Sequence, residues 1–287
     1  MNNSQPVIAI IGAGVMGEAI ISGLLNKKLT VPEAIRASDP LADRRNVLHD
    51  QYGVIASADN QSAVKDANVV VLSVKPQKLE KALAGLTGQI PAEALVFSIV
   101  AGASLENISE FLHHPTVVRA MPNTPAQIGE GITVWTTSPT VSQGQVDLAR
   151  QILSALGQEI YMEEEYYLDM ATALSGTGPA YVFLFMEAMI DAGVHLGFPR
   201  RISEQLVTQT IRGSLDYYAY RKTHVASLRN EVTSPGGTSA AAIYYLEKAG
   251  VRTAISRAVW AAYERSQELG RGKNSQPPEN KNHDTNA

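Results

Sequence analysis

Three glycines near the start of the chain constrain its fold more than any other feature. Gly12, Gly14 and Gly17 follow the apolar run Val7–Ile11 directly and precede a helical pattern. At this spacing the first glycine permits a tight turn, the second allows a ligand to approach the backbone, and the third lets helix and strand pack. The helix N-terminus then offers free N–H groups to phosphate. The pattern predicts a dinucleotide site on a Rossmann domain; the alternative is a glycine turn in an unrelated α/β fold.

The first half of the chain supports that fold class. Short runs that are apolar throughout alternate with helical patterns, as in a parallel sheet whose strands are buried on both faces. The predicted strands are Val7–Ile11, Ala34–Ser38, Val69–Val74, Leu95–Ile99 and Thr116–Arg119, with Ile132–Trp135 and Glu159–Tyr161 as additional edge strands. The predicted helices are Met16–Lys28, Asp43–Tyr52, Gln61–Ala67, Leu79–Leu86 and Leu105–Leu112. We expect an α/β Rossmann domain with a doubly wound parallel sheet over residues 1–165.

The second half shows no strand pattern, and we expect an all-α domain over residues 166–270 and a disordered tail over 271–287. The helical patterns are Tyr166–Leu196, Pro199–Tyr220, Val225–Asn230, Thr238–Ala249 and Val251–Leu269, the first interrupted at Gly176–Pro179. There is no Lys or Arg from Gln151 to Pro199, although the chain has 24. Such a helix is expected to pack against an apolar surface, either inside the domain core or, as we prefer, at a subunit interface.

Composition argues against several classes of function. The formal net charge of −4 gives no electrostatic footprint for nucleic acid or anionic lipid. The absence of cysteine excludes disulfides, thiolate metal sites and a Cys nucleophile. The N-terminus lacks the basic start of a secretory signal, and no apolar run approaches the length of a membrane span. We therefore expect a cytoplasmic protein with a small-molecule ligand and no bound metal.

Residues at the end of the second predicted strand bear on the choice of dinucleotide. Asp39 lies 22 residues beyond Gly17, where an acidic side chain bonds the ribose 2′-hydroxyl of NAD and repels the 2′-phosphate of NADP. Ser38, Arg44 and Arg45 argue for NADP, because guanidinium suits phosphate. The two arginines could equally solvate a helix face. The residues thus leave NADPH and NADH both open.

Further segments lie where a ligand is expected. Ser73–Pro76 closes the predicted strand Val69–Val74, at an edge where loops line the ligand crevice. Lys75 could approach the nicotinamide ribose, or Lys-Pro could simply end the strand. Val118–Pro125 leaves another strand as a turn held by two prolines, and Leu174–Tyr181 interrupts the long helix.

The last such segment runs from Val232 to Ser239. Gly236 and Gly237 let the backbone approach a ligand, and Thr238 is placed to cap the helix that follows. A glycine loop at a helix N-terminus can bind a carboxylate. The same pattern is also explained by a well-formed N-cap alone.

Taken in order, these segments resemble the pyrroline-5-carboxylate reductase family. The resemblance rests on five motifs between Val7 and Leu269: Gly12–Gly17, Val74–Pro76, Arg119–Pro125, Ser175–Tyr181 and Ser234–Thr238. It implies reduction of the cyclic imine 1-pyrroline-5-carboxylate to L-proline by NADPH or NADH, the last step of proline biosynthesis. It also implies a Rossmann domain followed by a helical domain through which at least a homodimer forms, with the active site between the cofactor and helical elements of the dimer.

The resemblance further implies the site residues. Those for the cofactor are Gly12, Gly14, Val15, Met16, Gly17, Ser38, Asp39, Asn60, Ser73, Val74, Lys75, Pro76, Met121, Pro122 and Asn123. Those for the substrate are Asn123, Ser175, Gly176, Thr177, Ser234, Gly236, Gly237 and Thr238. The Ser234–Thr238 loop would receive the carboxylate, the Thr238 hydroxyl would face the imine nitrogen as the catalytic group, and Asn60 would lie near the adenosine ribose. Two residues depart from the family: Thr177 replaces a more usual Ser, and Asp39 replaces a small polar residue, which puts the usual preference for NADPH in doubt.

The reaction requires little acid–base machinery, because the substrate can arrive as an iminium ion. This agrees with a sequence in which His113, His114 and His195 are each best interpreted as structural. A β-hydroxyacid dehydrogenase shares the two-domain plan, but its catalytic Lys is missing from the cation-free helix. A reductase of another cyclic imine and a non-catalytic nucleotide sensor remain as alternatives; the sensor would need neither the Met121–Pro125 loop nor the Ser234–Thr238 loop.

Overall fold

The short apolar runs of the first half form an eight-stranded sheet in the computed structural model, which describes residues 5–270. Its order is β3-β2-β1-β4-β5-β6-β7-β8. The strands are β1 (Ile8–Ile11), β2 (Ile35–Ser38), β3 (Ile55–Ser57), β4 (Val69–Leu72), β5 (Leu95–Ser98), β6 (Val117–Met121), β7 (Gly131–Thr137) and β8 (Gly157–Tyr161). The first six follow the Rossmann order and are parallel.

The last two strands were both predicted at an edge of the sheet, and this is confirmed for β8, which ends the strand order. β7 pairs antiparallel with β6, and β8 pairs parallel with β7. The stretch Ile132–Trp135 was expected at an edge, and that expectation is wrong, since β7 lies between two strands. Its burial agrees with an inner position: Trp135 is fully buried, and its indole N–H donates to Glu159 of β8 at 2.5 Å.

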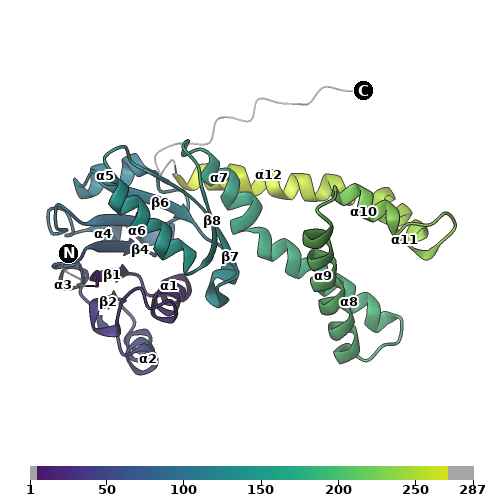
Figure 1. Ribbon diagram of the computed structural model, residues 1–287, viewed down its shortest axis with the longest axis horizontal. Coiled ribbons are helices and arrows are strands. Elements are labelled where there is room, and N and C mark those ends of the chain that lie inside the picture. The colour runs from purple at the N-terminus through teal and green to yellow at the C-terminus, as the bar shows by residue number, and fades with distance from the viewer. Residues whose placement is uncertain (1–4, 271–287) are drawn as a thin grey trace. The chain divides into compact units, whose positions relative to one another are not determined.

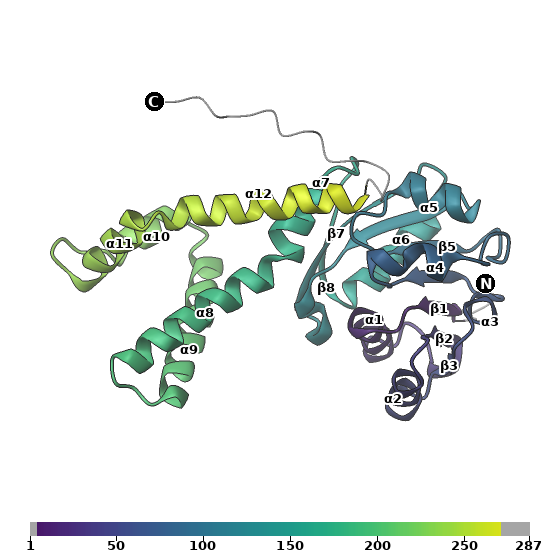
Figure 2. The ribbon, with the colours of Figure 1, turned by 180° about the vertical axis from the view of Figure 1, so that it is seen from behind.

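Alternate residues of the strands belong to two separate cores, one on each face of the sheet. Helices cover both faces (Figures 1 and 2). On β1, Ile8 and Ile10 face one core while Ala9 and Ile11 face the other. The first core is covered by α1 (Val15–Asn26), α2 (Ala42–Tyr52) and α6 (Gln143–Ser154). The second is covered by α3 (Asn60–Val64), α4 (Leu79–Leu83) and α5 (Leu105–Leu112). This two-sided burial explains why the strands are apolar throughout.

Helix α6 was absent from the sequence prediction. It begins with a capping box, in which the Ser142 hydroxyl accepts the Gln145 N–H while the Gln145 side chain accepts the Ser142 N–H. Ser-x-x-Gln before an apolar pattern is a recognised helix start. The signal was therefore present in the sequence.

The second half is helical, as expected, within the described residues. The elements are α7 (Tyr167–Ala171), a π-helical turn η4 (Thr172–Gly176), α8 (Gly178–His195), α9 (Arg200–Arg221), α10 (Val225–Glu231), α11 (Thr238–Lys248) and α12 (Val251–Gly270). Two compact units result: the first extends to Thr177 and includes the chain again from Ala261, and the second is Gly178–Trp260. The domain limits 1–165 and 166–270 stay a prediction, and the tail 271–287 lies outside the described residues.

The predicted break at Gly176–Pro179 is confirmed, but it is only one residue long. The helix passes through the π-turn, and only Thr177 lies outside helical assignment before α8 begins. Pro179 is tolerated because it is the second residue of α8, where the N–H that proline lacks has no intrahelical partner.

Helix α8 buries none of its residues within the chain. Phe183, Leu184 and Phe185 are between 53% and 67% exposed. A position inside the domain core is therefore wrong for this helix, and His195 is the last residue of a helix that the chain itself does not bury. Together with α7 and the π-turn, it makes a helix of 29 residues, Tyr167–His195, that is long and apolar enough to cross a membrane by length and composition alone. The expectation that no apolar segment approaches that length is corrected accordingly.

Candidate functional site

The glycine turn between β1 and α1 has the geometry that a bound phosphate requires. Gly12 has φ +88°, and a Cβ there would lie 2.4 Å from Val74 Cγ1. A Cβ on Gly17 would lie 2.7 Å from the Gly12 carbonyl oxygen. Gly14 differs, because a Cβ there would meet nothing within 4 Å. Packing within the chain thus explains Gly12 and Gly17. At Gly14 there is an open space next to the backbone, here called the cradle, that a side chain would fill.

The backbone donors of this cradle belong to the first turn of α1. The first intrahelical bond runs from the Glu18 N–H to the Gly14 carbonyl at 2.8 Å, so the N–H groups of Val15, Met16 and Gly17 precede the helical ladder. Gly14 is the N-cap and provides no side-chain cap. These N–H groups and the helix dipole suit a diphosphate, so the turn fits the dinucleotide that the sequence implies.

The end of β4 is fixed to this turn. The Ser73 hydroxyl donates to the Gly12 carbonyl at 2.6 Å, and the Ser73 N–H donates to the Ile11 carbonyl at 2.9 Å. Val74 packs against Gly12, as described above. Lys75 is exposed and precedes the short 3₁₀ turn η2 (Pro76–Lys78). The structure thus places Ser73 and Val74 at the glycine turn; the proposed approach of Lys75 to a ribose stays a prediction.

The end of β2 brings together three further predicted cofactor residues. The Ser38 hydroxyl donates to Asn60 Oδ1 at 2.6 Å, and Asn60 Nδ2 donates to the Ala82 carbonyl at 2.8 Å. Asp39 is buried, and its Oδ1 accepts the Leu41 N–H at 2.9 Å. Gly12 N–H also donates to the Ser38 carbonyl, which joins this group to the glycine turn.

Met121, the last residue of β6, lies against the π-turn. A Cβ on Gly176 would lie 2.9 Å from Met121 Cε, so these two residues are in close contact. Asn123 holds the following loop, since its Oδ1 accepts the Ile132 N–H at 3.0 Å. The hydroxyls of Ser175 and Thr177 donate to carbonyls of their own helix, at 3.0 Å and 2.8 Å. The first unit therefore brings together all predicted cofactor segments and the first predicted substrate segment.

The Ser234–Thr238 loop lies in the second unit. Gly236 has φ +74°, which favours glycine, and the Gly237 N–H donates to the Ser234 carbonyl at 3.0 Å. Gly237 is the N-cap of α11, and Thr238 is its first residue. The prediction that Thr238 caps this helix is therefore wrong: the extended residue before the helix is the glycine, and no side chain caps the helix. Thr238 and Ser234 are both exposed.

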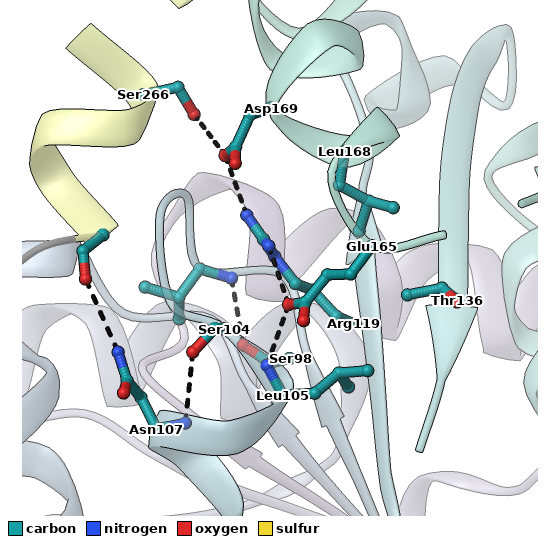
Figure 3. A network of polar contacts seen from close by, with 12 residues as sticks. Ser98, Ser104, Leu105, Asn107, Arg119, Thr136, Glu165, Leu168, Asp169 and Ser266 are labelled. Atoms are coloured by element: carbon teal, nitrogen blue, oxygen red, sulfur yellow. Dashed lines mark hydrogen bonds and ion pairs between the residues drawn. The ribbon is translucent and has the colours of Figure 1, made fainter. Parts of the chain in front are cut away.

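A buried ion-pair network beside the site had no assigned role in the sequence analysis. Arg119 of β6 has a side chain only 5% exposed; its Nη1 lies 2.8 Å from Glu165 Oε1 and its Nη2 lies 3.0 Å from Asp169 Oδ1 (Figure 3). Glu165 Oε1 also accepts the Leu105 N–H at 2.8 Å, and Asp169 Oδ1 accepts the Ser266 hydroxyl at 2.8 Å. An arginine within a buried apolar strand could have indicated this network from the sequence, because a buried charge requires a partner of opposite charge.

The predicted structural role of the histidines after α5 agrees with their geometry. His114 is buried, with Nε2 2.7 Å from the Ala94 carbonyl, and His113 is the left-handed C-cap of α5. Among residues 5–270, no group of three or more His, Cys, Asp or Glu side chains is arranged to hold a metal ion.

Comparisons with known proteins cover both halves of the chain. A family model described as pyrroline-5-carboxylate reductase dimerisation matches residues 165–269, and one described as F420-dependent NADP oxidoreductase matches residues 7–102. A pyrroline-5-carboxylate reductase of Synechocystis sp. is 44% identical over 264 residues, which cover 92% of this chain and 98% of that protein.

Solved structures give the same result. A pyrroline-5-carboxylate reductase from Coxiella burnetii has 34% identity and a TM-score of 0.82, covering 93% of this chain and 99% of that one. The Plasmodium falciparum pyrroline carboxylate reductase with NADP bound has 30% identity and a TM-score of 0.86, covering 94% of this chain and 99% of that one.

Proposed function

The chain belongs to the pyrroline-5-carboxylate reductase family, and from that premise we propose how its own residues carry out the reaction. The reaction is the reduction of 1-pyrroline-5-carboxylate to L-proline with NADPH or NADH, the last step of proline biosynthesis. The observation that carries the residue assignment is Gly14, whose missing side chain serves neither the packing nor the backbone conformation of the chain. A ligand that approaches this backbone accounts for it.

The cofactor residues divide by the part of the dinucleotide they would hold. The N–H groups of Val15, Met16 and Gly17 would bind the diphosphate. Asp39 and Ser38 would lie at the adenosine ribose, because they close β2, the strand next to β1. Asn60 would lie there too, because it is bonded to Ser38. Residues after β4 and β6 (Ser73, Val74, Lys75, Pro76, Met121, Pro122 and Asn123) would hold the remainder. When bound, the cofactor supplies a hydride.

The substrate residues must hold a carboxylate and an imine nitrogen. Helix α11 offers the first. Its ladder begins with the Ala241 N–H bonded to the Gly237 carbonyl at 3.2 Å, so the N–H groups of residues 238–240 are available to a carboxylate. The exposed Thr238 hydroxyl would donate to the imine nitrogen or accept from its protonated form, and so stabilise the form that accepts hydride. Ser175, Gly176 and Thr177 would enclose the ring. Hydride transfer requires an approach of about 3–3.5 Å, so positioning is the main contribution of these residues.

The family match supports a homo-oligomer with a small-molecule substrate. We propose that the oligomer is at least a homodimer joined through the helical second half. The apolar side chains of α8 support this, because large exposed apolar surfaces in a single chain mark interaction sites. A second copy is a better partner for α8 than a bilayer, since Glu187 and Asp191 lie within the helix. The absence of a nucleic-acid partner and a cytoplasmic location stay predictions from composition.

The experiment is the loss of reduced-cofactor absorbance on addition of 1-pyrroline-5-carboxylate, run separately with NADPH and NADH, with proline measured as product. A matched reaction with 1-pyrroline, which lacks the carboxylate, tests the α11 loop; we expect a KM at least tenfold higher, as for loss of a charge-assisted hydrogen bond. No proline from folded protein that binds a dinucleotide would contradict the proposal and favour another cyclic imine or a sensor.

A further inference from the structure

Arg44, near the start of α2, reaches back to the glycine turn. Its Nη2 lies 2.9 Å from the Ala13 carbonyl oxygen and 2.6 Å from Glu18 Oε2, and its Nε lies 3.3 Å from the same carbonyl. Ala13 is fully buried between Gly12 and Gly14, so its carbonyl requires a partner within the protein. Arg44 is therefore bonded to the part of the turn that faces away from solvent.

Glu18 makes this bond more than a surface ion pair. It lies in the first turn of α1, directly after the N–H groups assigned to the diphosphate, and it is 24% exposed against 27% for Arg44. The Tyr52 hydroxyl donates to its other oxygen at 3.1 Å. Burial and the neighbouring Glu18 carboxylate both raise the pKa of Tyr52, so Tyr52 remains a neutral donor. Without Arg44, a carboxylate would stand unneutralised beside the phosphate site, and like charges at short range repel.

Arg45 makes contacts of another kind. Its Nη1 donates to the carbonyl oxygens of Asp39 at 2.9 Å and Pro40 at 3.0 Å, in the turn that follows β2. This turn carries the residues that meet the adenosine ribose in a Rossmann fold. The guanidinium has five N–H donors, and within residues 5–270 its hydrogen bonds to Asp39 and Pro40 use Nη1 alone. Arg45 thus has donors left for a phosphate at the 2′ position.

We propose that the two neighbouring arginines have separate tasks. Arg44 is a positioning residue: it holds the Ala13 carbonyl and neutralises Glu18, and so sets the affinity for the diphosphate that NADPH and NADH share. Arg45 is a specificity residue that recognises the 2′-phosphate. The inference rests on the proposed dinucleotide site and adds the assignment of each arginine to it.

The test measures binding directly, by isothermal titration calorimetry of the full chain with NADPH and with NADH in the absence of any imine. Arg44→Gln is expected to raise both dissociation constants about tenfold and to leave their ratio within about twofold of wild type. Arg45→Gln is expected to raise the constant for NADPH about tenfold and that for NADH less than about twofold. Arg150→Gln is the matched control: it removes an arginine paired with Glu159 at 3.2 Å and should change neither constant.

A second substitution separates positioning from loss of structure. Adding Glu18→Gln to Arg44→Gln removes the unneutralised charge and should recover at least threefold of the lost affinity for both cofactors. Arg44→Lys keeps the positive charge but not the planar set of N–H donors. It should give a smaller loss of affinity that is again equal for the two cofactors.

The inference is overturned if Arg44→Gln changes the ratio of the two constants more than Arg45→Gln does, or if Glu18→Gln recovers nothing. A wild-type chain that binds neither dinucleotide would instead overturn the proposed function itself. The two failures are therefore distinguishable.

Discussion

Replacing Arg119 by methionine should destabilise the first compact unit by about 2–3 kcal/mol. Methionine preserves most of the apolar stem but leaves Glu165 and Asp169 without their cation. Removing one partner of a buried ion pair typically costs about 3–5 kcal/mol. We expect a smaller cost than this here because Glu165 and Asp169 are 29% and 19% exposed, so water solvates part of each charge. The loss of stability should extend beyond β6, because the network also joins α7, the start of α5 and the end of α12.

The assay is urea unfolding of the variants at one fixed protein concentration, because association with a second copy would itself change the apparent stability. Arg265→Met is the matched control: it removes an arginine paired with Glu268 at 2.7 Å, but with side chains 65% and 51% exposed, and should cost less than about 1 kcal/mol. Adding Glu165→Gln and Asp169→Asn to Arg119→Met should recover at least half of the loss. If Arg119→Met and Arg265→Met cost the same, the network does not hold these elements together.

Three further predictions address the site. Gly14→Val should weaken the binding of both dinucleotides at least tenfold, measured by calorimetry. It should leave the melting temperature unchanged, because a Cβ there meets nothing within 4 Å and the backbone is extended. A lower melting temperature would show that Gly14 serves packing. Thr238→Ala should lower kcat/KM for the imine by roughly ten- to a thousand-fold, because it removes about 1.5–4 kcal/mol of hydrogen bonding to a charged group. Unchanged kinetics would remove Thr238 from the mechanism. The pKa of Tyr52 is raised above its usual value of 10.0 by burial and by Glu18, so its contribution is present below that pH and lost as pH rises through the raised pKa. Tyr52→Phe should therefore flatten the alkaline fall of the melting temperature, and an unchanged alkaline slope would contradict this.

The elements that sequence predicted well are those set by local pattern. The limits of α5 agree with the predicted Leu105–Leu112, and those of the first two strands agree within one residue. Apolar runs and helical spacing act within a few positions along the chain, so one sequence is enough to recognise them. The direction of β7 could not be found in this way, because a short residue pattern identifies a strand but not the neighbouring strand with which it pairs.

Contacts between distant positions were also beyond the sequence. Arg119 pairs with residues 46 and 50 positions away, and Asp169 pairs with Ser266 at a separation of 97. No periodicity records such a pairing. The arginine in an apolar strand indicated that an acidic partner exists, but many Asp and Glu residues could have filled that role. Likewise, Arg44 and Arg45 are indistinguishable in sequence and differ only in what they contact.

The two halves of the proposed site also differ in how far their glycines argue for a ligand. Gly236 has φ +74°, so the turn before α11 requires glycine whether or not anything binds there. Gly237 has a neighbour, the Ser234 carbonyl oxygen, 3.2 Å from where its Cβ would be. Gly14 has neither reason, since its φ is −68° and its open side is empty of protein atoms. Its identity, together with its place as the N-cap of α1 after the buried strand β1, therefore argues for a ligand without the family relationship. The substrate loop needs that relationship to be distinguished from an ordinary helix start. Activity lost on replacing Gly236 would be ambiguous for the same reason, and binding lost on replacing Gly14 would not.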